Sequence, residues 1–124
     1  MPAYNFQRQF VDKVRSGVKE QTIRRRRKNP TKAGDLLYLY TGMRTKQCEL
    51  IGKYLCVGVR RVQINMRPPQ VWVNGLRLAD EYLAKFVTWD GFDNAEEFFK
   101  FFERYPREVL ENELEVIYWR PYAA

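Results

Sequence analysis

The sequence predicts a single α+β domain built on a small, partly open β-barrel of about five or six strands with two or three helices. Its 124 residues are the length of one domain. Strand-like and helix-like segments alternate without the regular order of strand, helix and strand that marks parallel sheets. Gly52 and Gly58 interrupt the longest strand candidate, where a bulge or sharp bend is expected, as in small barrels.

The N-terminal segment is expected to form a helix, because apolar residues recur there every four positions: Phe6, Phe10 and Val14. Asn5 is the candidate N-cap, and Gly17 stands where a left-handed C-terminal cap is expected. Residues 21–24 then predict a short extended segment that leads into a run of basic residues.

The rest of the chain divides into strands followed by helices and a last strand. Apolar and β-branched runs predict strands over residues 36–41, 50–64 and 114–119. Asn74 and Gly75 separate two apolar runs within residues 70–78 and predict a hairpin. Helices are expected over residues 80–87 and from Asp93, with Glu96 completing a capping box and Tyr105 and Pro106 ending the helix. Four phenylalanines in this helix are expected in the core.

Positive charge is concentrated near the N-terminus. The chain carries a net charge of +7, and residues 1–33 hold ten Lys and Arg residues against two Asp and Glu residues. Five basic residues follow one another at the centre of this surplus: Arg24, Arg25, Arg26, Arg27 and Lys28. Such a run predicts a polyanionic partner, with nucleic acid favoured over an acidic membrane surface, whereas a solvated loop is the other interpretation.

Composition excludes several classes of site. The chain has no histidine, so Ser-His-Asp and Cys-His catalytic arrangements and His-ligated metals are excluded within one chain. Its two cysteines, Cys48 and Cys56, are too few for a structural zinc site, and we expect no metal and no cofactor. No apolar run is long enough to span a membrane, and the first residues do not resemble a secretory signal. A reducing, cytoplasmic compartment is therefore expected, with no membrane partner.

Four short motifs follow one another along the chain. The first has the spacing Gly-x-Lys-x-x-Thr-Ile-Arg and consists of Gly17, Lys19, Thr22, Ile23 and Arg24. The others are the pair Gly34 and Asp35 before an apolar strand, Asp90-Gly91-Phe92 before the Phe-rich helix, and a terminal strand ending at Trp119. In this order the motifs resemble the ASCH domain, a member of the PUA-like superfamily of small β-barrels, and the resemblance covers roughly residues 6–119.

The resemblance implies recognition of RNA or of a modified nucleoside or nucleotide in a cleft on the barrel. One ASCH branch is similar to bacterial acetylcytidine amidohydrolases, which act through a Lys, a Thr and a Glu, and another branch is reported to cut RNA. Carried over, these roles fall on Lys19, Thr22 and Asp90. The last is a departure, since Asp is one methylene shorter than Glu and places its carboxylate further back.

The residues themselves allow two interpretations of this constellation. Thr22 could act as a nucleophile if Lys19, with a pKa lowered by neighbouring cations, removed its proton. Alternatively, Lys19 and Arg24 bind phosphate, Thr22 satisfies a strand-end hydrogen bond and Asp90 caps a turn. Trp89 is a candidate for stacking on a base beside Asp90.

We therefore expect an RNA- or nucleotide-binding domain whose cleft is lined by Lys19, Thr22, Arg24 and Asp90, with the basic run as its electrostatic entrance. Whether the protein is an enzyme is left open. The alternatives are a metal-free hydrolase, either an amidohydrolase on acylated cytidine or a ribonuclease, and a protein-interaction module with a basic loop.

Overall fold

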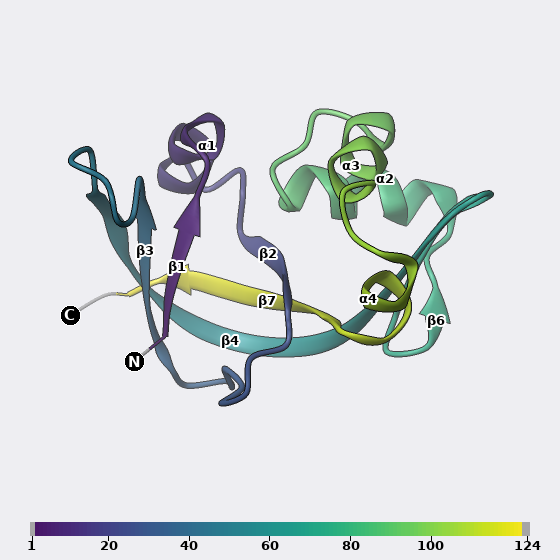
Figure 1. Cartoon of the computed structure of the whole chain (residues 1–124), viewed down its shortest axis with the longest axis horizontal. Helices are drawn as coiled ribbons and strands as arrows, with labels where there is room; N and C mark the ends of the chain where they lie inside the picture. The colour runs from purple at the N-terminus through teal and green to yellow at the C-terminus, as the bar shows by residue number, and fades with distance from the viewer. Residues whose placement is uncertain (1, 123–124) are drawn as a thin grey trace.

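A computed structural model describes residues 2–122 and shows a mixed seven-stranded sheet with helices packed on it (Figure 1). The α+β prediction is confirmed. The strands are β1 (Ala3–Phe6), β2 (Gln21–Arg25), β3 (Leu36–Thr41), β4 (Glu49–Met66), β5 (Pro69–Val73), β6 (Leu76–Arg77) and β7 (Leu114–Pro121). The helical elements are a 3-10 turn η1 (Arg8–Phe10), α1 (Val11–Arg15), α2 (Asp80–Trp89), α3 (Ala95–Phe102) and α4 (Arg107–Asn112).

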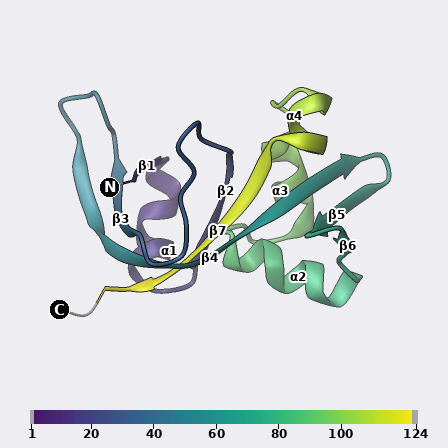
Figure 2. The ribbon, with the colours of Figure 1, turned by 90° about the horizontal axis from the view of Figure 1, so that it is seen from below.

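Strand β4 connects the two halves of the molecule. Its first part pairs with β3, its last part pairs with β5, and β7 lies along its other edge, as the long ribbon in Figure 2 shows. The pairing register shifts opposite Gly52 and again between Cys56 and Gly58. Both irregularities lie beside the glycines where bends were predicted. Each places an extra residue in one strand, and such an extra residue bends the strand and increases its twist.

The sheet is not closed. β1 pairs in parallel with β3, and β2 pairs with β7, but within residues 2–122 no strand pairing joins β1 to β2. Arginine side chains of the β2 segment bridge this opening instead: Arg24 donates to the main-chain oxygen of Asn5 at 2.7 Å, and Arg27 donates to that of Ala3. Figure 1 shows β2 in the middle, with β1 and α1 on one side and α3 on the other.

The N-terminal helix is shorter than predicted. Residues 3–6 form β1, so Asn5 and Phe6 belong to a strand, and Asn5 caps no helix. Tyr4 and Phe6 are both buried, and this spacing of two residues is the repeat of a strand. The segment pairs with an edge of β3. Phe10 and Val14 are buried as predicted, and Gly17 has the left-handed backbone expected of a C-terminal cap, with φ of 84°.

Two helix boundaries also differ from prediction. The N-cap of α3 is Asn94, whose side chain accepts from the Glu97 N–H at 2.9 Å, while Asp93 instead forms an ion pair with Lys13 at 2.8 Å. α3 ends before Tyr105 and Pro106, but this proline then precedes a further helix, α4, that was not predicted. Proline suits this place because its fixed φ fits the start of a helix and a missing N–H costs nothing there.

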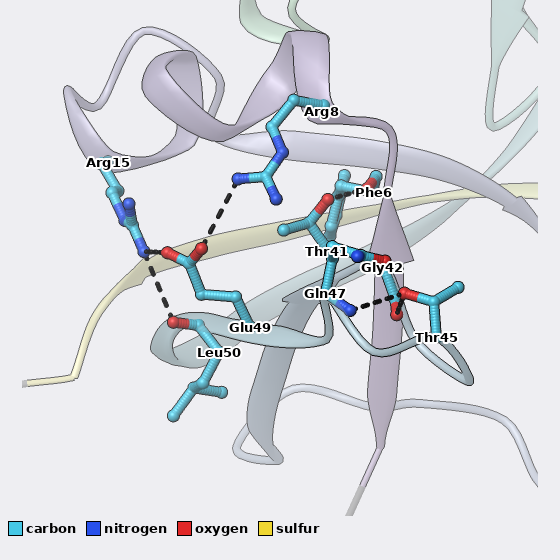
Figure 3. Close-up of polar contacts among 9 residues, drawn as sticks. All are labelled: Phe6, Arg8, Arg15, Thr41, Gly42, Thr45, Gln47, Glu49 and Leu50. Carbon is cyan, nitrogen blue, oxygen red and sulfur yellow. Dashed lines mark hydrogen bonds and ion pairs between the residues drawn. The ribbon is translucent and has the colours of Figure 1, made fainter.

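The turn between β3 and β4 is held against the first helical segment. Arg15 and Arg8 both reach Glu49, at 2.8 Å and 3.5 Å, and the Thr41 hydroxyl donates to the main-chain oxygen of Phe6 at 2.8 Å (Figure 3). The two arginines lower the pKa of the exposed Glu49 carboxyl.

Among the described residues, no helix is both long and apolar enough to cross a membrane.

Candidate functional site

A cavity of about 220 Å³ lies where β2 faces the start of the chain and α3. The structure brings four of the predicted site residues into its wall: Lys19, Thr22, Arg24 and Asp90. Three of these side chains are buried, since Lys19 is 3% exposed, Thr22 4% and Asp90 2%. Buried polar groups at a concave surface are typical of a binding or catalytic site.

The other wall of the cavity is aromatic. It consists of Phe6, Phe10, Phe92, Phe101, Phe102 and Tyr105. Phe10 and Phe92 contact edge to face with centroids 5.4 Å apart, Phe92 and Phe101 are tilted at 5.3 Å, and Phe102 stacks on Tyr105 at 5.8 Å. Phe98, Phe99 and Phe102 of α3 are buried in the core, as predicted, whereas Phe101 is only half-buried. The wall therefore offers ring faces and edges to a flat ligand.

Lys19 is buried, and both its backbone N–H and its side-chain amine donate hydrogen bonds. Its N–H donates to the Lys13 carbonyl at 2.9 Å in the turn after α1, and its Nζ donates to the main-chain oxygen of Asp90. The ring centroids of Phe10 and Phe6 lie 4.9 Å and 5.5 Å from Nζ. Burial lowers the pKa of Lys19 to about 8, while the nearby carboxylate of Asp90 acts in the opposite direction. A lysine in this state exchanges its proton near neutral pH.

Asp90 follows the last residue of α2, and its carboxylate is turned inward. Its Oδ1 accepts from Gln21 Nε2 at 3.3 Å, and Gln21 itself is fully buried. Burial raises the pKa of Asp90 to about 6, against the opposing effect of Lys19. Within residues 2–122 the two groups form no ion pair shorter than 4.0 Å, so each keeps polar capacity for a ligand.

Thr22 and Arg24 point to the same side of β2. The Thr22 hydroxyl oxygen accepts from Arg24 Nε at 3.0 Å, and the guanidinium lies 4.6 Å from the Phe6 ring centroid. The hydroxyl proton of Thr22 is left to donate to a ligand. In the described part of the chain no hydrogen bond joins Thr22 to Lys19, so the base–nucleophile contact of the hydrolase hypothesis is not made here.

One edge of β2 is not paired with another strand among the described residues. Arg26 N–H donates to the Glu113 carbonyl at 2.8 Å, and Trp119 N–H donates to the Glu20 carbonyl at 3.1 Å. Even-numbered residues of β2 therefore direct their backbone groups toward β7, and odd-numbered residues direct theirs away from it. Ile23 lines the cavity and is one of these. Its N–H and C=O are therefore directed away from β7, and the described strand pairings do not use them.

The side chains of the basic run have different neighbours in the structure. Arg25 pairs with Glu113 at 2.7 Å, and the Arg27 guanidinium lies 3.9 Å from the Tyr4 ring centroid. Arg26 borders a different hollow, beside Glu115, and Lys28 is exposed. Of these five residues, only Arg24 reaches the cavity.

Trp89 lies outside the cavity although Asp90 is its neighbour in sequence. Its ring packs edge to face against Tyr82, with the ring centroids 5.7 Å apart.

Sequence reasoning also missed Arg104, which lines the cavity. Its Nε donates to the Phe101 carbonyl at 3.0 Å, and its guanidinium lies 4.1 Å from the centroid of the Phe101 ring. No sequence signal distinguishes Arg104 from other helix-end arginines, because its role depends on which way α3 faces.

Among the described residues, no group of three or more Cys, Asp or Glu side chains is placed to hold a metal ion.

No protein-family model matches the chain, and neither does any curated protein or solved structure. The geometry of the cavity is therefore the basis of the functional argument.

Proposed function

We propose that this protein binds RNA or a nucleotide by taking one nucleobase into the cavity beside β2. The observation that carries the proposal is the pairing of an aromatic wall with a polar wall in one small cavity. A nucleobase requires both, since its faces stack on aromatic rings and its edge exchanges hydrogen bonds.

The size and chemistry of the cavity support a single base. A volume of about 220 Å³ corresponds to about seven water molecules at roughly 30 Å³ each. Ile23 N–H and C=O are suited to the adjacent acceptor and donor on a base edge, and the Thr22 hydroxyl supplies a further donor. Arg24 and Arg104 stand at the cavity to neutralise an attached phosphate.

The same proposal includes the finer fold assignment. We propose that the sheet is a PUA-like barrel of the ASCH type, left open between β1 and β2. The arginine contacts from the β2 segment to the main chain of Asn5 and Ala3 support it, because they link the two edges that strand pairing would otherwise join. The open edge is also where Ile23 faces the cavity.

Binding is tested by calorimetric titration with the four nucleoside monophosphates. Arg104→Gln should weaken binding about 10- to 150-fold, because a hydrogen bond to a charged group is worth roughly 1.5–3 kcal/mol. Arg107→Gln is the matched control, since Arg107 is an exposed arginine three residues away that lies outside this cavity and pairs with Glu111. Absence of binding by wild type to any of the four nucleotides and to single-stranded RNA would contradict the proposal.

A metal-free amidohydrolase on acylated cytidine is the second candidate, because a lysine with a lowered pKa and a protonatable carboxyl share the cavity. In this proposal Thr22 Oγ1 attacks the acyl carbon, Lys19 takes the hydroxyl proton and passes it to the leaving amine, and water then hydrolyses the acyl-threonine. Turnover of N4-acetylcytidine that is lost in Lys19→Met and in Thr22→Val would support it. No turnover by wild type or by Asp90→Glu would exclude it.

A further inference from the structure

A second aromatic and basic surface lies on the outer side of α2, away from the cavity wall. Tyr82 and Trp89 are two helical turns apart on the same side of α2, and their rings meet edge to face at 5.7 Å. Tyr82 is 47% exposed although its ring is large and mostly apolar. Figure 2 shows α2 beside β6 at this outer edge of the molecule.

A shallow hollow of about 300 Å³ adjoins Tyr82 and is formed by β4, β6, β7 and the start of α2. Tyr118 of β7 forms part of it, and Leu76 of β6 is 74% exposed at its margin. The hollow therefore exposes apolar surface from Leu76 and from the ring of Tyr82.

Two arginines border the hollow without a carboxylate partner. Arg60 and Arg77 are exposed, and within residues 2–122 neither takes part in an ion pair. The Arg60 guanidinium lies 5.5 Å from the Tyr118 ring centroid. Arg25 and Arg107, by contrast, are each paired with a glutamate. The hollow therefore combines ring surface with positive charge that is available to an anion.

This combination decides between occupants. An apolar helix would bury the rings but leave the two guanidinium groups without partners, which is costly. An acidic peptide would satisfy the arginines but has no requirement for the exposed ring of Tyr82. A single-stranded nucleic acid uses both, because its bases stack on aromatic side chains while its phosphates contact arginines.

We propose that Tyr82, Tyr118, Arg60 and Arg77 form a second binding surface for single-stranded RNA, with a base on the Tyr82 ring and phosphates on the arginines. The proposal rests on the proposed function and extends it, because a surface outside the cavity serves a polynucleotide and not a free nucleotide. Helix α2 connects the two sites, because Asp90 after its last residue lines the cavity and the preceding Trp89 contacts Tyr82 of the second surface.

The test compares an RNA strand of about eight nucleotides with a nucleoside monophosphate, using wild type and Tyr82→Leu. Leucine keeps apolar volume but removes the ring, so affinity for the RNA strand should fall about 5- to 30-fold while mononucleotide affinity is unchanged. Tyr122→Leu is the matched control, because Tyr122 is 50% exposed and lies outside the hollow. This control variant should bind both ligands as wild type does.

A second variant tests the charges separately. Arg60→Gln combined with Arg77→Gln should weaken RNA binding and make the slope of log affinity against log salt shallower by about 1.4, at roughly 0.7 for each phosphate that is no longer neutralised.

The two proposals fail in different ways. If wild type binds neither mononucleotide nor RNA, the proposed function is wrong and this inference falls with it. If wild type binds RNA but both the Tyr82 variant and the double arginine variant match it, only this inference is wrong. A polyglutamate peptide that binds wild type and loses affinity equally in Tyr82→Leu would overturn the RNA assignment in favour of an acidic protein partner.

Discussion

Gly91 is the position where one methyl group should most directly disturb the cavity. It follows Asp90, and its backbone has a φ of 99°, in the left-handed region. A Cβ atom at this position would lie 2.9 Å from Lys19 Cδ and 2.9 Å from Phe10 Cδ1. Both side chains are buried, so neither can move aside without disturbing its neighbours.

The cost of Gly91→Ala has two parts. A side chain in the left-handed region costs about 1–2 kcal/mol, and the stiffer unfolded chain returns about 0.4–1 kcal/mol of this. Crowding of a packed interior adds about 1–3 kcal/mol. The free energy of unfolding should therefore fall by about 1–4.5 kcal/mol. Urea denaturation measures this loss, and the dependence of unfolding free energy on urea concentration should not change.

Gly34→Ala is the control for the backbone part alone. Its φ is 96°, close to that of Gly91, but a Cβ there would meet no atom within 4 Å. This variant should lose only about 1 kcal/mol and should retain nucleotide binding, whereas Gly91→Ala should also weaken binding because Lys19 has to shift. Equal losses of unfolding free energy in the two variants would refute the argument from close approach.

Two further predictions follow from the charges. Burial raises the pKa of Asp90 from 3.8 to about 6, so the folded protein holds this proton more tightly than the unfolded chain and ionisation destabilises the fold as pH rises through that range. Relative to Asp90→Asn, wild type should lose about 1–3 kcal/mol of unfolding free energy between about pH 4 and about pH 7, and a difference independent of pH would contradict the burial. Replacing Arg25, Arg26 and Arg27 together by Ala should flatten the salt dependence of RNA binding, by about 0.7 for each phosphate that these arginines neutralise in wild type. Mononucleotide affinity should not change, because none of the three lines the cavity; an unchanged salt slope would show that this run does not contact RNA.

Several elements could be predicted from the sequence because their causes are local. Strand β3 has the predicted bounds, and the predicted hairpin forms with Asn74 and Gly75 both at positive φ. An alternating pattern of apolar residues and an Asn-Gly turn act within a few residues of one another. The same holds for the bends near Gly52 and Gly58, where the missing side chain permits the irregularity.

Other elements depended on contacts between distant parts of the chain. Phe6 was predicted as part of a helix with Asn5 as its N-cap, because Phe6 fits a helical repeat with Phe10 as well as a strand repeat with Tyr4. Pairing with the free edge of β3 decides between the two. Sequence periodicity cannot resolve such a choice, since the energy that settles it comes from hydrogen bonds to another strand.

Some features of the candidate site likewise follow from the sequence, and others depend on tertiary packing. The sequence alone determined which polar side chains stand in the motifs, and that no histidine or cysteine cluster is available to them. The family resemblance led to the expectation that Lys19 and Asp90 share a cleft. Only the tertiary structure decided that Lys19 donates to the main-chain oxygen of Asp90, that both side chains are buried, and that Trp89 lies outside the cavity. Burial shifts both pKa values, and burial is a property of packing around a residue and not of its neighbours in sequence. For the same reason the aromatic wall could be assembled only in three dimensions, because its rings come from β1, η1, α3 and the segments on either side of α3.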